Sequence, residues 1–231
     1  MAADDEKVTP ARRGRWGRRL LLVLLVVVVA AWLTVSHRPS WWTAGGDRSA
    51  AAEARGVSFE NAMVREITEV RDDPAPWGFV VTDGDVNAWL ANRLVPWVES
   101  RGDVDLPPGI DDPRMRFIEG GIEVGVSGPL GGVATARFAI ALDGDDLVVT
   151  PTGGGLGWIS LGEGAARSTA STIAEMLGGS DGMRVGDVRL DPEGRVRVKA
   201  TIPLSDGRRV EVDDLEIVAG EFAVRFRTVG R

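Results

Sequence analysis

The sequence contains no cysteine, and its only histidine is His37. Without cysteine the chain forms no disulfide and offers no thiolate as a nucleophile or as a metal ligand. The usual zinc sites need more than one imidazole or thiolate, and a Ser-His-Asp site would depend on His37 alone. His37 lies just beyond a long apolar run, so we interpret it as a solvated flanking residue. We therefore expect no enzyme, no cofactor and no bound metal.

Phosphate-binding motifs are also missing. The glycines at 153–155 and 157 do not have the Gly-x-Gly-x-x-Gly spacing, and no Gly-Lys-Ser/Thr follows them. We interpret this stretch as a flexible link. Clustered aspartates are candidates for an acid-base pair or a calcium site, but most fall where turns are expected, and aspartate favours turns for local reasons. These clusters are Asp83/Asp85, Asp103/Asp105, Asp111/Asp112, Asp143/Asp145/Asp146 and Asp213/Asp214.

The net charge is unevenly distributed along the chain. Residues 1–19 carry one Lys and five Arg against three acidic residues, a net +3, so the rest of the chain must carry −10 to give the total of −7. Such an acidic remainder would be repelled by a phosphate backbone, and it contains no clustered basic face. We therefore expect no nucleic-acid partner. The 231 residues, 44% of them hydrophobic, suffice for one ordinary domain core.

One long apolar run follows the basic N-terminal residues. Leu20 to Val35 reads LLLVLLVVVVAAWLTV and carries no charge. Its helix would rise only about 24 Å, but extension back to Trp16, with Arg18 and Arg19 snorkelling outward, approaches the ~30 Å of a hydrocarbon core. The run therefore predicts a single helix across the membrane.

The distribution of basic residues predicts the orientation of this helix. Residues 1–19 should stay in the cytoplasm, and the chain after about Ser36 should lie outside the bacterial cytoplasmic membrane. The alternative is a cleaved signal peptide, with a processing site at Val29-Ala30-Ala31. We favour the uncleaved anchor because the apolar run continues past that site and ends in tryptophans.

The pattern divides the chain into a cytoplasmic tail (1–19), a membrane anchor (20–35), a stalk (36–56) and an exported domain (57–231). In that domain the periodicity predicts a first helix capped by Ser58 and a second helix over 165–177. Because hairpin-length links outnumber helical crossovers, we expect an α+β fold: a curved, largely antiparallel sheet packed against two or three helices. The predicted strands are 78–81, 115–126, 133–142, 147–150, 183–190, 195–204, 210–218 and 221–228.

The stretch TDGDVNAW, which begins at Thr82, begins like a calcium loop. It then lacks the glycine and the glutamate that such a loop requires at its sixth and twelfth positions, where Ala88 and Leu94 stand. A helix start fits better, because Thr82 and Asp85 have the spacing of a capping box. Asn87 is not explained by this interpretation, since its amide lies next to an apolar stripe and needs a partner.

The phrase FVVTDGDVNAWLANRL, together with an N-terminal anchor and the order of helices and strands, resembles the YpmS-like group of bacterial single-pass envelope proteins. The matching residues are Val81, Thr82, Asp83, Asp85, Asn87, Trp89 and Leu90. More broadly, the layout resembles bacterial relatives of the tubular lipid-binding (TULIP) superfamily. That resemblance implies a curved sheet around a helix and a groove that takes an acyl chain, with no catalytic residues.

The apolar faces of the expected elements allow two interiors. The candidate groove residues are Asn87, Trp89, Leu90, Phe117, Phe138, Ile140 and Ile173. They would either line a groove of lipid size or close on each other as a dry core, since periodicity does not distinguish the two.

The leading hypothesis is thus a non-enzymatic, membrane-anchored envelope protein that binds a lipid or another apolar ligand. An interaction or scaffolding module with a closed core, docking an envelope protein partner, is the alternative. A carboxylate-dependent hydrolase is a third.

Overall fold

The computed structural model describes residues 13–43, 45–69, 71, 76–101, 112–128, 131–164, 167–168, 188–204 and 207–229. Over these residues the chain has a mixed α+β fold, with few helices and with strands that pair antiparallel. The predicted α+β class with antiparallel pairing is confirmed. The helices are α1 (Arg13–Val35), α2 (Ala50–Thr68), α3 (Asp83–Asn92) and α4 (Leu94–Arg101).

The strands within the described residues form two sheets, whereas the sequence pattern predicted one curved sheet. The first sheet has the order β1-β11-β10-β9, and the second has the order β2-β3-β4-β5-β8-β7 with β6 paired to β5. The first consists of β1 (Trp77–Thr82), β9 (Thr201–Pro203), β10 (Arg209–Val218) and β11 (Glu221–Val229). The second consists of β2 (Arg114–Ile118), β3 (Gly121–Ser127), β4 (Val133–Asp143), β5 (Asp146–Leu156), β6 (Ile159–Ser160), β7 (Arg189–Leu190) and β8 (Val196–Lys199).

The two sheets meet at Ala200, between β8 and β9. Its N–H donates to the carbonyl of Asp145 at 2.9 Å, and its own carbonyl accepts from the N–H of Val212 in β10 at 2.8 Å. The predicted single strand over 195–204 is therefore wrong: the chain changes sheets in the middle of it. The small Ala200 side chain is buried at this corner, where a larger one would hold the sheets apart.

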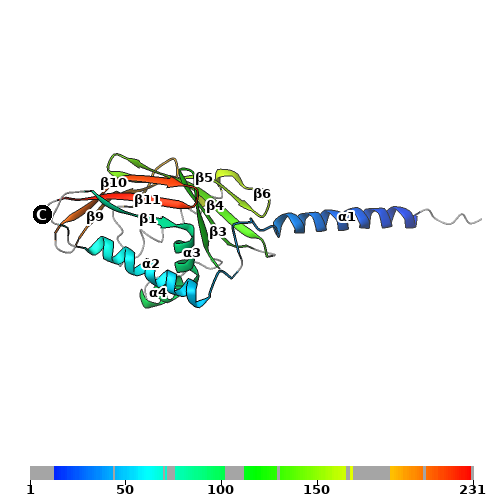
Figure 1. Cartoon of the computed structure of the whole chain (residues 1–231). Helices are drawn as coiled ribbons and strands as arrows, with labels where there is room; N and C mark the ends of the chain where they lie inside the picture. The colour runs from blue at the N-terminus through cyan, green and yellow to red at the C-terminus, as the bar shows by residue number, and fades with distance from the viewer. Residues whose placement is uncertain are drawn as a thin grey trace, which may run out of the picture.

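The main core lies between α2, α3, the first sheet and the β2–β4 part of the second sheet (Figure 1). At its centre are Val81, Phe117 and Ile217, against which α2 packs Phe59 and Met63. Two further clusters extend this core along the sheets. They are centred on Val210, Val224 and Phe226 in the first sheet, and on Ala136, Phe138 and Val196 in the second.

Helix α2 begins eight residues before the predicted cap at Ser58. Its N-cap is Ser49, whose hydroxyl accepts from the N–H of Ala52 at 3.2 Å. The prediction of a stalk did not take into account that Ala50 to Arg55 are good helix formers. Gly56 then brings α2 close to α3, because a Cβ there would lie 3.0 Å from the Ala88 carbonyl oxygen. The end of the predicted stalk is thus part of the folded domain.

The connection between α1 and α2 lies against the outer face of the second sheet. Trp42 is buried, and the guanidinium of Arg116 lies 5.1 Å from the centre of the Trp41 ring. Arg116 and Arg137 both pair with Glu123, whose side chain is 2% exposed. Trp41 and Trp42, which fall in the predicted stalk, therefore pack on the domain, and the stalk interpretation did not anticipate this.

Helix α1 extends away from both sheets as a separate rod (Figure 1). Its large apolar side chains are exposed to solvent from Val23 to Val29, and again at Trp32 and Leu33. Within the part of the chain that the structure describes, none of the helices meets the length and hydropathy that a membrane crossing requires. The anchor over 20–35 stays a prediction.

Two predictions about short segments of the second sheet can be compared with the structure. The predicted hairpin at Asp143–Asp146 is confirmed, since these residues pair across the β4–β5 turn and Gly144 has a φ of 61°. The flexible link at 153–155 is wrong, because these glycines continue β5 and pair with β4. The second predicted helix lies outside the described residues except for 167–168, as does the predicted strand over 183–190 before 188.

Candidate functional site

The start of α3 forms a complete capping box. The Thr82 hydroxyl accepts from the N–H of Asp85 at 3.3 Å, and the Asp85 carboxylate accepts from the N–H of Thr82 at 3.2 Å. The helix start predicted from TDGD is confirmed. Arg55 of α2 also donates to Asp85 at 2.7 Å. Burial alone would raise the pKa of Asp85, but hydrogen bonds from Thr82 and Arg55 outweigh it and lower the pKa below its ordinary value.

Asp83 and Asn87, one helical turn apart on α3, hold the open edge of β2. The Asn87 side-chain amide donates to the carbonyl of Met115 at 2.7 Å and accepts from the N–H of Met115 at 2.9 Å. Asp83 accepts from the N–H of Phe117 at 2.6 Å. Four residues along a helix rise about 6 Å, which is close to the length of two residues along a strand, so Asp83 and Asn87 reach alternate residues of β2. Asn87 has its partners in the backbone of β2, which explains why a polar residue stands beside the apolar stripe.

The helical segment that begins at Asp83 is not continuous. It divides at Arg93 into α3 and α4 because Pro96 clashes with the carbonyl of Asn92 in a continuous helix. Arg93 donates to Glu60 of α2 at 2.9 Å, and the Trp89 indole donates to the same carboxylate at 3.3 Å. The hydrogen bond from Arg93 lowers the pKa of Glu60. Trp89 therefore fixes α3 to α2.

An apolar cavity of about 390 Å³ lies between α2, α3 and the two sheets. The fifteen described residues that line it all carry apolar side chains. The helices contribute Phe59, Met63 and Val86; the first sheet contributes Phe79, Val81, Val212, Leu215, Phe222, Val224 and Phe226; the second contributes Met115, Phe117, Ile122, Ile140 and Leu147. Several of these side chains are only partly buried, so apolar surface remains uncovered inside the domain.

Only some of the predicted groove residues line the cavity. Phe117 and Ile140 line the cavity. Phe138 shares a face of β4 with Ile140 but belongs to the cluster around Val196. Three predicted residues of α3 do not line the cavity: Asn87 pairs with β2, Trp89 faces α2, and Leu90 is partly buried elsewhere. Ile173 lies outside the described residues.

Sequence reasoning missed several residues of the cavity wall. Phe59 and Met63 were not among the predicted groove residues, although they lie four residues apart on α2, a spacing that indicates one buried helix face. Leu215 lies in the strand predicted over 210–218, but a register shift in β10 between Val212 and Asp214 changes which residues face inward. Strict alternation therefore gives the wrong face for part of that strand.

No model of a known protein family, no curated protein and no solved structure matches the chain. The resemblance to YpmS-like and TULIP proteins remains a hypothesis from the sequence.

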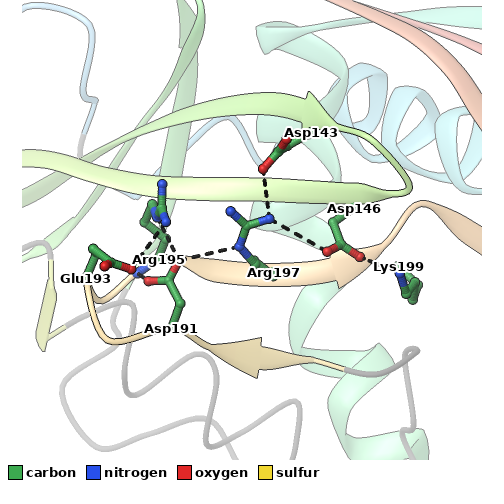
Figure 2. Close-up of polar contacts among 7 residues, drawn as sticks. All are labelled: Asp143, Asp146, Asp191, Glu193, Arg195, Arg197 and Lys199. Atoms are coloured by element: carbon green, nitrogen blue, oxygen red, sulfur yellow. Dashed lines mark hydrogen bonds and ion pairs between the residues drawn. The ribbon is translucent and has the colours of Figure 1, made fainter.

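Acidic clusters at the domain surface are engaged with basic side chains. Figure 2 shows Arg197 between Asp143, Asp146 and Asp191, at 2.9, 3.7 and 3.4 Å. Lys199 lies 2.9 Å from Asp146, and its hydrogen bond lowers the pKa of that carboxyl. In the described ranges no group of three potential metal ligands comes together. The aspartates drawn in Figure 2 thus act as ion-pair partners of β8. Asp213 and Asp214 of β10 pair in the same way with Arg227 and Arg225 of β11.

The cavity offers one kind of chemistry. Among the described residues, its wall provides no hydrogen-bond donor, acceptor or charge from a side chain, so these residues select a ligand by size and by apolar surface. Such a site accommodates a hydrocarbon chain or an apolar side chain, and any polar group on the ligand must lie outside it.

Proposed function

We propose that the protein is a non-enzymatic, membrane-tethered envelope protein whose domain binds the hydrocarbon part of a lipid. The observation that supports this is the apolar cavity of about 390 Å³ between α2, α3 and the sheets. Its volume lies within the range of about 300–1,000 Å³ typical of ligand sites. Since the lining residues that the structure describes are all apolar, a lipid headgroup would stay outside while its chain enters.

The partly exposed lining favours an occupant over an empty cavity. Met63, Met115 and Leu215 leave apolar surface uncovered, and each Å² that a ligand removes from water contributes about 25 cal/mol. Methionine side chains adapt to ligands of differing shape. A hydrocarbon chain in the cavity would therefore stabilise both the lipid and the domain. The resemblance to TULIP proteins agrees with this chemistry.

The proposal also includes membrane attachment through α1. The valine and leucine side chains from Val23 to Val29 are 44–65% exposed, an arrangement that is unfavourable in water and favourable in a lipid phase. We therefore place residues 20–35 in the bacterial cytoplasmic membrane, the tail over 1–19 in the cytoplasm and the domain outside.

A photoactivatable fatty acid tests lipid binding in the full chain. The protein is reconstituted into vesicles that contain the probe, irradiated and digested, and the labelled peptides are identified by mass spectrometry. We expect labels on residues that line the cavity, such as Phe59 of α2 and Phe222 of β11. Labels on α1 report contact with the membrane and provide the internal standard.

A cavity-filling variant supplies the control for this experiment. Met63→Trp combined with Leu215→Trp should lower cavity labelling relative to α1 labelling by about tenfold, equivalent to ~1.4 kcal/mol of binding free energy. Val80→Trp, on an exposed position of β1, should leave the ratio unchanged. Labels confined to α1 would contradict lipid binding. They would favour the closed-core interaction module, which a crosslinked envelope protein partner would then identify.

A further inference from the structure

The turn between β5 and β6 exposes a cluster of large apolar side chains. Trp158 is 69% exposed, Leu161 52% and Ile159 40%. Single exposed apolar residues are common on soluble domains, but a tryptophan and two aliphatic residues within four positions of one hairpin are a contiguous patch. Trp158 is the most exposed large apolar residue of the described domain.

This turn is bonded to the C-terminal end of α1. The Trp158 N–H donates to the carbonyl of Thr34 at 3.0 Å, a carbonyl in the last turn of α1 that has no partner within its own helix. The Trp158 ring lies 4.5 Å from the imidazole of His37. Gly157, with a φ of 59°, permits this approach, since a Cβ there would lie 2.2 Å from the Thr34 oxygen.

A second contact holds the same end of α1 on the sheet. Gly132, just before β4, approaches the helix so closely that a Cβ would lie 1.9 Å from the Val35 carbonyl oxygen. Beyond the helix, Arg38 donates from Nε to the carbonyl of Gly131 at 2.7 Å. The hairpin turn and the end of α1 are therefore held together at several points, and in Figure 1 β6 lies beside the domain end of α1.

The exposed apolar residues at this junction form one surface, which we call the apolar collar. It consists of Trp158, Ile159 and Leu161 of the β5–β6 hairpin, next to the C-terminal end of α1. The collar continues the exposed apolar surface of α1 onto the folded domain. An amphipathic indole beside an apolar helix is the arrangement that tryptophan adopts where a membrane meets water.

We propose that the apolar collar is a second membrane contact, in which the β5–β6 turn inserts into the interfacial layer of the bilayer that holds α1. This inference rests on the proposed membrane attachment of α1. Because the turn and α1 share backbone contacts, the collar holds the domain at one orientation on the membrane surface. The domain then does not swing on a free tether, and its cavity keeps a constant position relative to the lipid.

Depth-dependent fluorescence quenching in the full chain tests the collar. The chain has no cysteine, so a single introduced cysteine is a unique labelling site. Leu161→Cys carries an environment-sensitive fluorophore on the collar, and Leu33→Cys carries it on α1. Ile202→Cys, an exposed position on β9 at the end of the domain opposite α1 in Figure 1, is the control. Each variant is reconstituted into phosphatidylcholine–phosphatidylglycerol vesicles with nitroxide groups at the lipid headgroup or in the acyl chain.

We expect the labels at 161 and 33 to be quenched and the label at 202 to stay bright. In the Leu161→Cys background, Trp158→Ser should reduce the quenching, whereas Leu190→Ser, on exposed β7, should not. Quenching at 33 but not at 161 would overturn the collar and leave the α1 anchor intact. Quenching at 161 but not at 33 would contradict the anchor, and it would overturn the inference as stated, because the collar is proposed as a second contact with the bilayer that holds α1. Absence of quenching at both positions would overturn both proposals.

Discussion

Replacement of Asn87 by alanine tests whether α3 is fastened to the edge of β2. The change removes two hydrogen bonds to Met115, each with a net contribution of about 1 kcal/mol. It also leaves a partly buried N–H and carbonyl of Met115 without this partner, which adds a desolvation cost. Alanine recovers about 0.6 kcal/mol of helix propensity relative to asparagine. We therefore expect the free energy of unfolding to fall by about 2 kcal/mol.

Two further substitutions separate hydrogen bonding from packing. Asn87→Asp keeps an acceptor for the Met115 N–H but places a carboxylate against the Met115 carbonyl, so it should cost as much as alanine or more. Asp83→Asn keeps an oxygen for the N–H of Phe117 and loses only the charge at the start of α3. Its cost should be about 0.5–1 kcal/mol.

Urea unfolding, followed by tryptophan fluorescence, measures these effects. A lower midpoint with an unchanged slope indicates a change in stability alone. The matched control is Asn61→Ala, at an exposed position of α2, which should change the stability by less than about 0.5 kcal/mol. If Asn87→Ala lies within the same range as Asn61→Ala, the two hydrogen bonds do not hold α3 and the reasoning is refuted.

Two other perturbations test the junction with α1 and the α3 cap. Gly157→Ala should destabilise the protein by about 3 kcal/mol, because it adds a clash with Thr34 to a positive φ, whereas Gly162→Ala has open space at a φ of 63° and should cost only about 1 kcal/mol. Thermal melting that shows equal costs would contradict the close approach. Asp85 has a lowered pKa in the folded protein, so its stabilising contribution is present above its ordinary pKa of 3.8 and is lost as the pH falls through the lower folded value. Stability measured from pH 6 downward should therefore decline less steeply in Asp85→Asn, and parallel curves would show that Asp85 does not contribute.

Local chemistry made part of this fold predictable. The cap at the start of α3 depends on Thr82 and Asp85, three residues apart, and such a pattern is visible in the sequence. The hairpin at Asp143–Asp146 is local in the same sense. The start of α2 was missed because a run of small residues suits a stalk as well as a helix, and only its packing on α3 decides between them.

Contacts between residues far apart in the sequence explain most of the remaining differences between the predicted and the observed structure. The hydrogen-bond partner of Asn87 is Met115, 28 residues away in β2, and no sequence pattern around Asn87 identifies it. Phe138 and Ile140 were both predicted to line a groove, but only their positions along β4 decide which of them meets the cavity. The exchange of sheets at Ala200 leaves the alternation of the sequence intact and is therefore invisible in it.

Strand β2 ends its sheet, and a free strand edge is a template on which another polypeptide can add a strand. Asp83 and Asn87 occupy the very backbone groups of Met115 and Phe117 that an incoming strand would need. The start of α3 thereby protects the chain against self-association through this edge. In the membrane-tethered arrangement proposed above, copies of the protein would be concentrated in two dimensions, and such protection would keep neighbouring domains from joining their sheets.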